Sequence, residues 1–299
     1  MKDIIIFGYA YDGVQLFRKL ENSALYKVIG FADNAAVKQE MKVNGCKIRS
    51  LDDLIEFKKH NDFSVIIASK MWIVISGQLE INNIPIEGIY INENIVTNFS
   101  RLDLSKDIKL YAGDICDDIH MSEPNLYGLS INKIDNKHIY HDITKKYPLP
   151  DNCISSYQAE DVLEHIEIEK VVTVINEIYR ILKWGGVFRI CLPDYNSPYL
   201  KKISMYDKAG NIVFDPTGGG VFNENGVQNG GHVWFPTYEN VKSILNKTLF
   251  EKIDFLCYHT SEEDLVRKNI NWSYGHINRL PKEGELDRPV YSIIVDCYK

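Results

Sequence analysis

Two histidines occur in settings that suit acid–base chemistry. His232 follows two glycines in a polar stretch, and His165 ends the run Leu163-Glu164-His165. Neutral imidazole titrates near physiological pH, so a histidine beside a reacting group can take its proton as a general base. We predict His232 as the first candidate catalytic residue and His165 as the second. Two alternatives stay open: His232 anchors its loop, and Glu164 with His165 is solvated or fixes the start of a helix.

A carboxylate stands where a short predicted strand ends. Asp142 follows the strand predicted over 138–141. In an open parallel sheet, ligands collect outside the carboxyl ends of the strands, near the point where the strand order reverses. Asp142 at such an end can accept a hydrogen bond from the amino group of an adenine. The alternative is that Asp142 caps a helix or belongs to a turn.

The elements that must position these residues alternate between strands and helices. This alternation predicts an α/β protein of two doubly wound, Rossmann-like domains with parallel strands and right-handed crossovers. Apolar residues at helical spacing predict a helix over 167–182, which paired glycines at 185 and 186 end in a left-handed cap. The stretch 215–235 is a long loop, a kind of segment that is usually functional or disordered. The strands predicted from residue 108 onward are 108–112, 126–131, 138–141, 153–158, 186–192, 250–258 and 291–298.

Four sequence segments between 142 and 194 resemble the class I S-adenosylmethionine-dependent methyltransferases. They are Asp142 to Asp151 (DITKKYPLPD), Val162 to Ile166 (VLEHI), Arg180 to Gly186 (RILKWGG) and Leu192 to Asp194. The resemblance implies S-adenosylmethionine as cofactor and a mixed seven-stranded sheet. It also implies that Asp142 contacts the adenine. The residues that the resemblance assigns to the cofactor are Tyr111, Gly113, Asp114, Ser130, Ile131, Asp142, Ile143 and Glu160.

The sequence departs from this family at two points of the cofactor site. The family carries a glycine-rich turn after its first strand, which lets the backbone approach the methionine half of the cofactor. Here only Gly113 remains of that turn. The acidic residue that holds the ribose is also absent, and Ser130 and Asn132 offer uncharged hydrogen-bonding groups instead. A catalytically inactive, methyltransferase-like binding or partner protein is therefore the alternative.

The acceptor side of the expected reaction is less defined. Methyl transfer is an in-line displacement by an oxygen or nitrogen nucleophile, so the protein contributes orientation, desolvation and proton removal. We assign the substrate pocket to Asp194, Tyr206 and Arg279. The pattern is closest to methyltransferases of surface-polysaccharide biosynthesis. It implies a small-molecule or sugar-nucleotide precursor of a bacterial capsular polysaccharide as substrate, such as one with a phosphoramidate-type substituent.

The first hundred residues carry a separate fingerprint. Gly8, Ala10 and Gly13 lie between a predicted strand and a helix, and Asp33 ends the next strand. This spacing is typical of a nucleotide site with a close backbone approach and an acid for ribose. The segment resembles the small N-terminal domains of bacterial sugar acyltransferases, which implies nucleotide-sugar binding. A structural or dimerising role is the alternative. A further hypothesis is an NAD-dependent oxidoreductase, which no dehydrogenase-like pattern in the second half of the chain supports.

Bulk properties place the chain among ordinary globular proteins. Its 299 residues predict two domains, which we place at 1–98 and 99–299. A net charge of −7 argues against nucleic-acid binding, and no apolar run is long enough for a membrane span. Six scattered cysteines without a CxxC pair indicate buried thiols and a cytoplasmic protein. We expect no bound metal ion, and a homodimer as one option for assembly.

Overall fold

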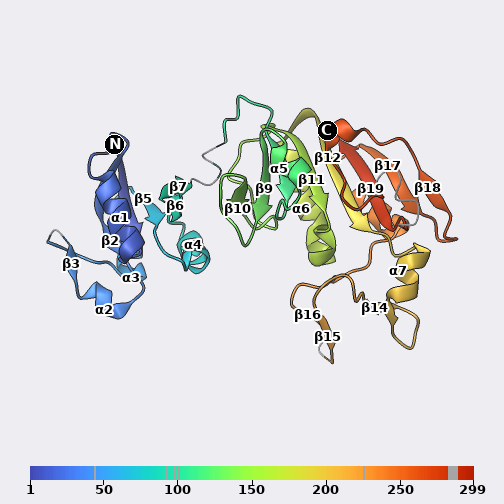
Figure 1. Cartoon of the computed structure of the whole chain (residues 1–299), viewed down its shortest axis with the longest axis horizontal. Coiled ribbons are helices and arrows are strands. Elements are labelled where there is room, and N and C mark those ends of the chain that lie inside the picture. The colour runs from blue at the N-terminus through green and yellow to red at the C-terminus, as the bar shows by residue number, and fades with distance from the viewer. Residues whose placement is uncertain (44, 92, 97–98, 100–101, 225, 282–288) are drawn as a thin grey trace. The chain divides into compact units, whose positions relative to one another are not determined.

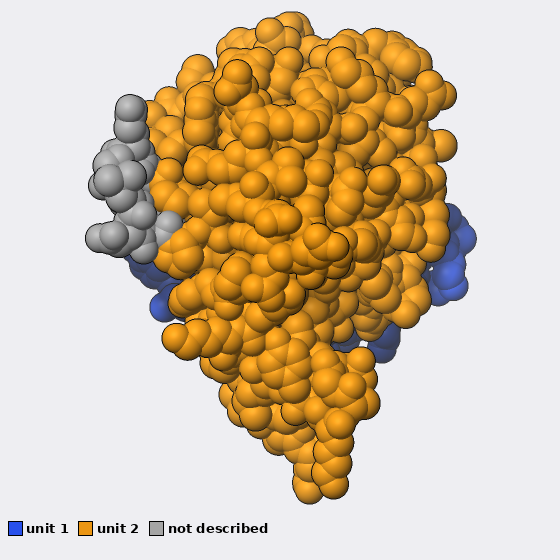
Figure 2. Space-filling view, turned by 90° about the vertical axis from the view of Figure 1, so that its right-hand side faces the viewer, with its two compact units in different colours: residues 1–102, 134–136 blue, residues 103–133, 137–299 orange. Residues whose placement is uncertain are grey.

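The chain divides into two compact units. The computed structural model describes all residues except 44, 92, 97–98, 100–101, 225 and 282–288 (Figure 1). One unit comprises residues 1–102 with 134–136, and the other comprises residues 103–133 with 137–299 (Figure 2). The boundary predicted after residue 98 falls at residues outside the described ones. Each unit is considered by itself below.

The first unit is built on a five-stranded sheet with the order β2-β1-β5-β6-β7. The continuous apolar run of β1 is buried on both faces, as the central strand of a parallel sheet requires. The strands expected before Gly8 and before Asp33 are β1 and β2, and β7 is added antiparallel to β6. The elements of this unit are β1 (Lys2–Phe7), α1 (Tyr11–Leu20), β2 (Tyr26–Ala32), α2 (Ala36–Gln39), β3 (Lys42–Val43), β4 (Cys46–Lys47), α3 (Leu51–Lys58), β5 (Ser64–Ile67), α4 (Trp72–Ile81), β6 (Ile86–Ile91) and β7 (Asn94–Val96).

The second unit is built on a mixed sheet with the order β10-β9-β8-β11-β12-β19-β17-β18. The first five strands are parallel, and β19, β17 and β18 continue the sheet antiparallel. This sheet has eight strands rather than the seven predicted, because the segment after β17 folds back as β18. Its strands are β8 (Lys109–Ala112), β9 (Leu126–Ser130), β10 (His138–Tyr140), β11 (Ile154–Glu160), β12 (Leu182–Pro193), β17 (Lys252–His259), β18 (Leu265–Arg267) and β19 (Ser292–Tyr298).

Two helices, α6 and α8, cover one face of this sheet with apolar side chains. The predicted helix is α6, and its buried stripe includes Val171, Val174, Ile175 and Ile178. The glycine cap is wrong: α6 ends at Ile181 and passes directly into β12, where Leu182 is already extended. The helices of this unit are α5 (Asp118–Ser122), η2 (Leu163–His165), α6 (Ile168–Ile181), α7 (Pro198–Ile203), α8 (Tyr238–Leu245) and η3 (Trp272–Tyr274).

The other face of the sheet carries a buried ion pair. Arg189 on β12 donates two hydrogen bonds to Asp296 on β19, at 2.8 and 2.7 Å, and both side chains are almost fully buried. Arg189 also donates to the carbonyl of Gly275, at 2.8 Å. The segment around η3 therefore covers this face and satisfies its charged groups. A buried pair of this kind is strongly destabilising when one partner is removed.

Two small hairpins extend from the body of the second unit. They are formed by β13 (Met205–Tyr206) with β14 (Ile212–Phe214), and by β15 (Val221–Asn223) with β16 (Gly226–Gln228). They project below the sheet in Figure 1 and form the narrow tip in Figure 2. The predicted long loop 215–235 thus contains one hairpin and continues to His232.

Two bulk expectations can be compared with the described residues. None of their helices has the length and apolar character needed to cross a bilayer. Five cysteines are described as free thiols, four of them buried, whereas Cys116 is exposed. The expectation of buried thiols is therefore confirmed for those four and wrong for Cys116.

Candidate functional site

The strand order reverses between β8 and β11, and the site lies at the carboxyl ends of these strands. From β8 the chain proceeds outward to β9 and β10, whereas β11 leads to β12 on the other side. This reversal opens a crevice in doubly wound sheets. Gly113 follows β8, and the turn η2 follows β11. The sequence segments predicted to carry chemistry therefore meet at one edge of the sheet.

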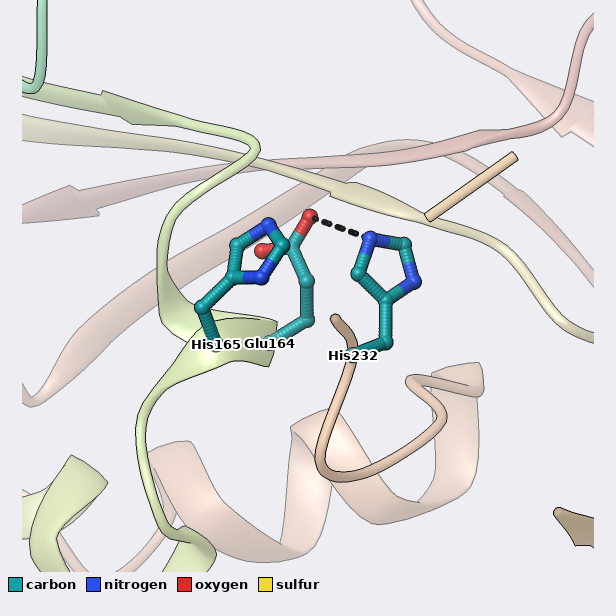
Figure 3. A group of neighbouring side chains, drawn as sticks. All are labelled: Glu164, His165 and His232. Carbon is teal, nitrogen blue, oxygen red and sulfur yellow. Dashed lines mark ion pairs between the residues drawn. The ribbon is translucent and has the colours of Figure 1, made fainter. Parts of the chain in front are cut away.

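The two predicted catalytic histidines and the neighbouring Glu164 converge beyond β11. Glu164 and His165 lie on η2, and His232 reaches them from the loop before α8 (Figure 3). One ligand-type atom from each residue lies within 4.8 Å of the others. The Nε2 atom of His232 is 3.7 Å from an Oε1 oxygen of Glu164, and the two imidazole rings pack edge to face at 4.8 Å. We call these three residues the Glu-His-His cluster.

Backbone hydrogen bonds hold the two segments of the cluster together. Val233 donates its amide to the carbonyl of Glu164 at 2.9 Å. Trp234 donates its indole N–H to the carbonyl of Leu163, also at 2.9 Å, and its ring is buried. Beyond Trp234, the Thr237 side chain caps α8 in a reciprocal capping box. The position of His232 is thus fixed by the element that follows it.

Glu164 is buried without hydrogen bonds to its carboxylate. Its exposed fraction is 0%, and neither carboxylate oxygen has a hydrogen-bond partner among the described residues. Burial raises the pKa of Glu164 well above its ordinary value, and the nearby charge of Asp161 raises it further. The prediction that Glu164 is solvated is therefore wrong.

His232 is held from its other side by a tyrosine and an aspartate. Its Nδ1 lies 2.5 Å from the hydroxyl of Tyr195, and that hydroxyl donates to Asp215 at 2.6 Å. Burial lowers the pKa of His232 to about 4, with a further contribution from His165. The imidazole is therefore neutral at physiological pH, and its pKa lies below the near-neutral value expected for a general base.

Arg279 borders the cluster through Asp161. Its guanidinium forms an ion pair with Asp161, which has a positive φ of 55°, and its Nε donates to Ser292 at 3.2 Å. The amide of Arg279 donates to Glu160 at 2.7 Å. Burial raises the pKa of Glu160. The predicted substrate residue Arg279 and the predicted cofactor residue Glu160 thus lie side by side, each bound to the other segment.

The remaining predicted cofactor residues occupy the ends of β8, β9 and β10. Gly113 has a φ of +96°, and a Cβ atom there would meet only a methyl of Val162 at 3.7 Å, so the backbone is open to a ligand. Ile131 exposes 57% of its surface at the end of β9. Ser130, in contrast, uses its hydroxyl to accept hydrogen bonds from two backbone amides of its own turn. Of the others, Asp114 pairs with Lys133, Ile143 is buried, and Tyr111 is buried against the ring of His120.

Asp142 has the turn role that was weighed from the sequence. Its Oδ1 oxygen accepts hydrogen bonds from the amide and hydroxyl of Thr144, at 2.9 and 2.7 Å. This arrangement is the turn role predicted as the alternative. Its Oδ2 oxygen has no hydrogen bond among the described residues, and the residue is half-buried at the end of β10. The carboxylate thus keeps one oxygen for a ligand, and its contact with adenine stays a prediction.

The two other predicted substrate residues are not part of the cluster. Asp194 is fully buried, and its carboxylate accepts from the amide of Asn196, and from the amide and ring of His259. The structure therefore gives Asp194 a structural role. Tyr206 lies on a projecting hairpin, where it is 45% exposed and donates its hydroxyl to the carbonyl of Lys201.

The fingerprint residues of the first unit are used within the loop itself. A Cβ atom on Gly13 would lie 1.9 Å from the carbonyl oxygen of Gly8, and one on Gly8 would lie 2.3 Å from the carbonyl oxygen of Ala68. Ala10 is the N-cap of α1 and makes no side-chain cap bond. The Asp33 carboxylate accepts hydrogen bonds from Tyr9, Ala35 and Lys38. The spacing therefore serves close packing and loop closure here, and its nucleotide role stays a prediction.

Three residues of the site were not predicted from the sequence. Tyr195 and Asp215 contact His232, and Asp161 pairs with Arg279. Asp161 had a signal, since it precedes the quoted VLEHI segment by one residue. Tyr195 and Asp215 had none, because they are brought to His232 only by the folding of the long loop.

Comparison with known proteins identifies the domain that carries this site. Residues 109–190 match the family model described as the methyltransferase domain. The chain carries a methyltransferase domain. The prediction of a methyltransferase is confirmed over this range, and the methyl donor expected for it is S-adenosylmethionine. The matched range runs from β8 into β12 and includes Glu164 and His165, whereas His232 lies beyond it.

Solved methyltransferase structures resemble the chain at low sequence identity. The chain is similar to a methyltransferase from Archaeoglobus fulgidus, with 16% identity, 64% of this chain and 86% of that chain covered, and a TM-score of 0.38. It is also similar to one from Mesorhizobium loti, with 16% identity, 66% and 94% covered, and a TM-score of 0.37. Likenesses at these scores carry no argument, so the assignment rests on the matched domain. No curated protein matches the chain.

Proposed function

We propose that this methyltransferase acts on a small-molecule or sugar-nucleotide precursor of a bacterial surface polysaccharide, and that the Glu-His-His cluster is its acceptor side. The observation that carries the placement is the convergence of Glu164, His165 and His232 beside the crevice between β8 and β11. Catalytic groups are expected where strand ends meet at a switch point. The substrate class rests on the resemblance of the VLEHI region to enzymes of that biosynthesis.

The strand ends next to the cluster fit the methyl donor. Gly113 leaves its backbone open, Ile131 offers an exposed apolar surface, and Asp142 keeps one carboxylate oxygen for a hydrogen bond. Bound S-adenosylmethionine supplies a methyl group on a positively charged sulfur, which is a good leaving group. The protein itself then has to place the acceptor in line with that methyl group and to exclude water.

The acceptor must lose a proton when its oxygen or nitrogen bonds to the methyl carbon and the carbon–sulfur bond breaks. In this proposal that proton leaves at the cluster, where His232 and His165 keep their predicted catalytic roles. His232 has an unprotonated ring nitrogen on the side of Glu164, and His165 is exposed and so accessible to the acceptor. The ion pair of Arg279 with Asp161 borders the cluster on a neighbouring side.

A groove in the first unit supports a sugar nucleotide as the ligand of this chain. A hollow of about 840 Å³ lies within that unit beside α1 and the carboxyl ends of β5 and β6. Arg18, Lys19 and Lys70 line it together with the aromatic rings of Tyr11 and Trp72. Cations suit phosphates, and aromatic rings suit the faces of a base or a sugar. The acidic residues Asp12 and Glu93 are also part of this lining.

One observation favours a second candidate function, a methyltransferase-like binding protein without activity. The hydroxyl of Ser130 is engaged by two backbone amides at the strand end where the family holds the ribose. A ribose hydroxyl would have to compete with those bonds. This candidate keeps the crevice and the cluster but assigns no methyl transfer to them.

Calorimetric titration of the full chain with S-adenosylmethionine, S-adenosylhomocysteine and NADH tests the proposed function. We expect dissociation constants on the order of 1–100 μM for the first two and no binding of NADH. Binding of S-adenosylhomocysteine combined with an absence of methyl transfer to capsular sugar nucleotides favours the second candidate. Absence of binding for both sulfur compounds would contradict the proposal.

A further inference from the structure

The Glu-His-His cluster brings three electron-pair donors within 4.8 Å of one another. Both carboxylate oxygens of Glu164 lie without a hydrogen-bond partner in the described part of the chain, at 0% exposure. The charge of Arg279 acts on Glu164 and partly offsets its burial, but the guanidinium forms its ion pair with Asp161 and not with Glu164. Isolating a buried carboxylate in this way is costly unless a positive group joins it.

The hydrogen bonds around His232 determine which of its ring nitrogens faces Glu164 unprotonated. Oδ2 of Asp215 can only accept, so the hydroxyl of Tyr195 donates to it at 2.6 Å. That hydroxyl can then only accept from the Nδ1–H of His232, 2.5 Å away. Neutral imidazole carries one proton, so Nε2 is left with a bare electron pair. This electron pair faces Oε1 of Glu164.

The separation of these atoms suits a metal ion better than a proton. The 3.7 Å between Nε2 and Oε1 exceeds the length of a hydrogen bond. A transition-metal ion binds imidazole nitrogen at about 2.0–2.1 Å and carboxylate oxygen at about 2.0–2.2 Å, which places two ligand atoms roughly 3–3.5 Å apart. The ligand atoms of the three residues lie within 4.8 Å of one another, so small side-chain rotations close the site.

We propose that Glu164, His165 and His232 bind one divalent transition-metal ion, of which Zn²⁺ is the model, with an open position for an oxygen of the methyl acceptor. Two imidazoles and one carboxylate form a donor set that holds such ions in catalytic sites and leaves a coordination position free. The role of the open position rests on the proposed function. The inference departs from the sequence, which led us to expect no metal.

Tyr195 and Asp215 complete the site as positioning residues. A ligating histidine usually donates its second ring N–H to a neighbouring acceptor, which fixes the tautomer and the ring orientation. Here Nδ1 donates to Tyr195 and Tyr195 donates to Asp215, while Asp215 also accepts from the amide and hydroxyl of Thr217. With such an ion bound, His232 and His165 would act as ligands and not as bases. An acceptor hydroxyl at the open position would then lose its proton to water, because the ion would lower the pKa of that hydroxyl.

Direct metal titration of the full chain tests this inference. The protein is dialysed against EDTA and then titrated with Zn²⁺ by calorimetry and with Co²⁺ by visible absorption. We expect one ion per chain with a micromolar dissociation constant, and cobalt d–d bands typical of nitrogen and oxygen ligands. Glu164→Gln and His232→Ala are expected to weaken binding by at least tenfold. Tyr195→Phe is expected to weaken it by about tenfold, with the three ligands still present.

Matched controls separate this site from adventitious binding. Glu167→Gln and His60→Ala change exposed residues of the same types and should leave the affinity unchanged. Circular dichroism melting of each variant shows that it is folded. A wild-type chain without saturable binding, or binding that Glu164→Gln and His232→Ala leave intact, would overturn the inference. Titration of the same samples with S-adenosylmethionine reports separately on the proposed function.

Discussion

The loop of the first unit and the Glu-His-His cluster of the second both follow strands of a doubly wound sheet. They differ in the hydrogen bonds that their buried carboxylates receive. The Asp33 carboxylate receives hydrogen bonds from Tyr9, Ala35 and Lys38. The Glu164 carboxylate receives none among the described residues. The first region matches a nucleotide fingerprint by spacing, yet its groups are satisfied internally. We infer that groups left without partners mark a site more reliably than a matching motif.

The largest expected effect is the loss of stability when the loop of the first unit is disrupted. Gly13→Ala places a Cβ against the carbonyl oxygen of Gly8, a backbone atom that cannot move aside freely. We expect a loss of about 3 kcal/mol or more in the free energy of unfolding of that unit. Chemical denaturation followed by circular dichroism measures it. The control Gly77→Ala, a helical position with nothing within 4 Å, should be neutral or stabilising. Equal effects of both substitutions would show that the loop is not tightly packed.

Asp33→Asn removes the acid that closes the same loop. Charge-assisted hydrogen bonds contribute about 1.5–3 kcal/mol, so we expect a loss of about 2 kcal/mol. Burial alone would raise the pKa of Asp33, but hydrogen bonds from Ala35, Lys38 and Tyr9 outweigh it and lower the pKa overall. A lowered pKa contributes stability above the ordinary range near 4 that is lost as the pH falls through the folded pKa. When the pH is lowered from 6 to 3, the urea midpoint of unfolding should fall for the wild type and change less for the variant. Parallel curves would contradict this role.

Asp142→Ala tests whether the end of β10 binds the cofactor. One oxygen of Asp142 closes a turn and the other is available, so the substitution removes a ligand contact and a turn contact together. We expect S-adenosylmethionine to bind at least tenfold more weakly, which corresponds to about 1.4 kcal/mol. Calorimetry measures the affinity, and the variant Thr144→Val, which removes only the hydroxyl of the turn, serves as control. An unchanged dissociation constant for Asp142→Ala would refute this placement of the adenine.

Glu164→Gln gives the smallest expected effect, with the opposite sign to Asp33→Asn. In metal-free protein the substitution replaces a buried carboxyl group that has no hydrogen-bond partner by a neutral amide of the same shape. We expect the second unit to gain about 1 kcal/mol in EDTA. Differential scanning calorimetry in EDTA measures the change, with the exposed Glu167→Gln as reference. A clear destabilisation would mean that the Glu164 carboxylate has a structural partner and is not available to bind a metal ion.

Sequence patterns predicted the scaffold well because burial periodicity determines it. The buried stripe of α6 and the apolar run of β1 follow directly from residue spacing. The end of α6 was predicted wrongly, because Gly185 has its positive φ inside an irregular stretch of β12 rather than at a helix cap. The eighth strand, β18, is only three residues long and exposed, so no periodicity marked it.

Side-chain partnerships were harder to predict than elements. His165 and His232 were recognised as candidates because histidines carry a chemical signal. Glu164 was considered only as the neighbour of His165. Their convergence depends on hydrogen bonds from Val233 and Trp234 to η2, which no local pattern encodes. The burial of Asp194 against His259 and the engagement of Ser130 by its own turn are likewise tertiary facts.

A crystal structure of the full chain with S-adenosylhomocysteine tests the central claim most directly. We predict density across the carboxyl ends of β8, β9 and β10, with the adenine near Asp142 and the sulfur directed toward His165 and Glu164. Density in the groove of the first unit beside Arg18 and Lys70, with none at Gly113, would contradict the account.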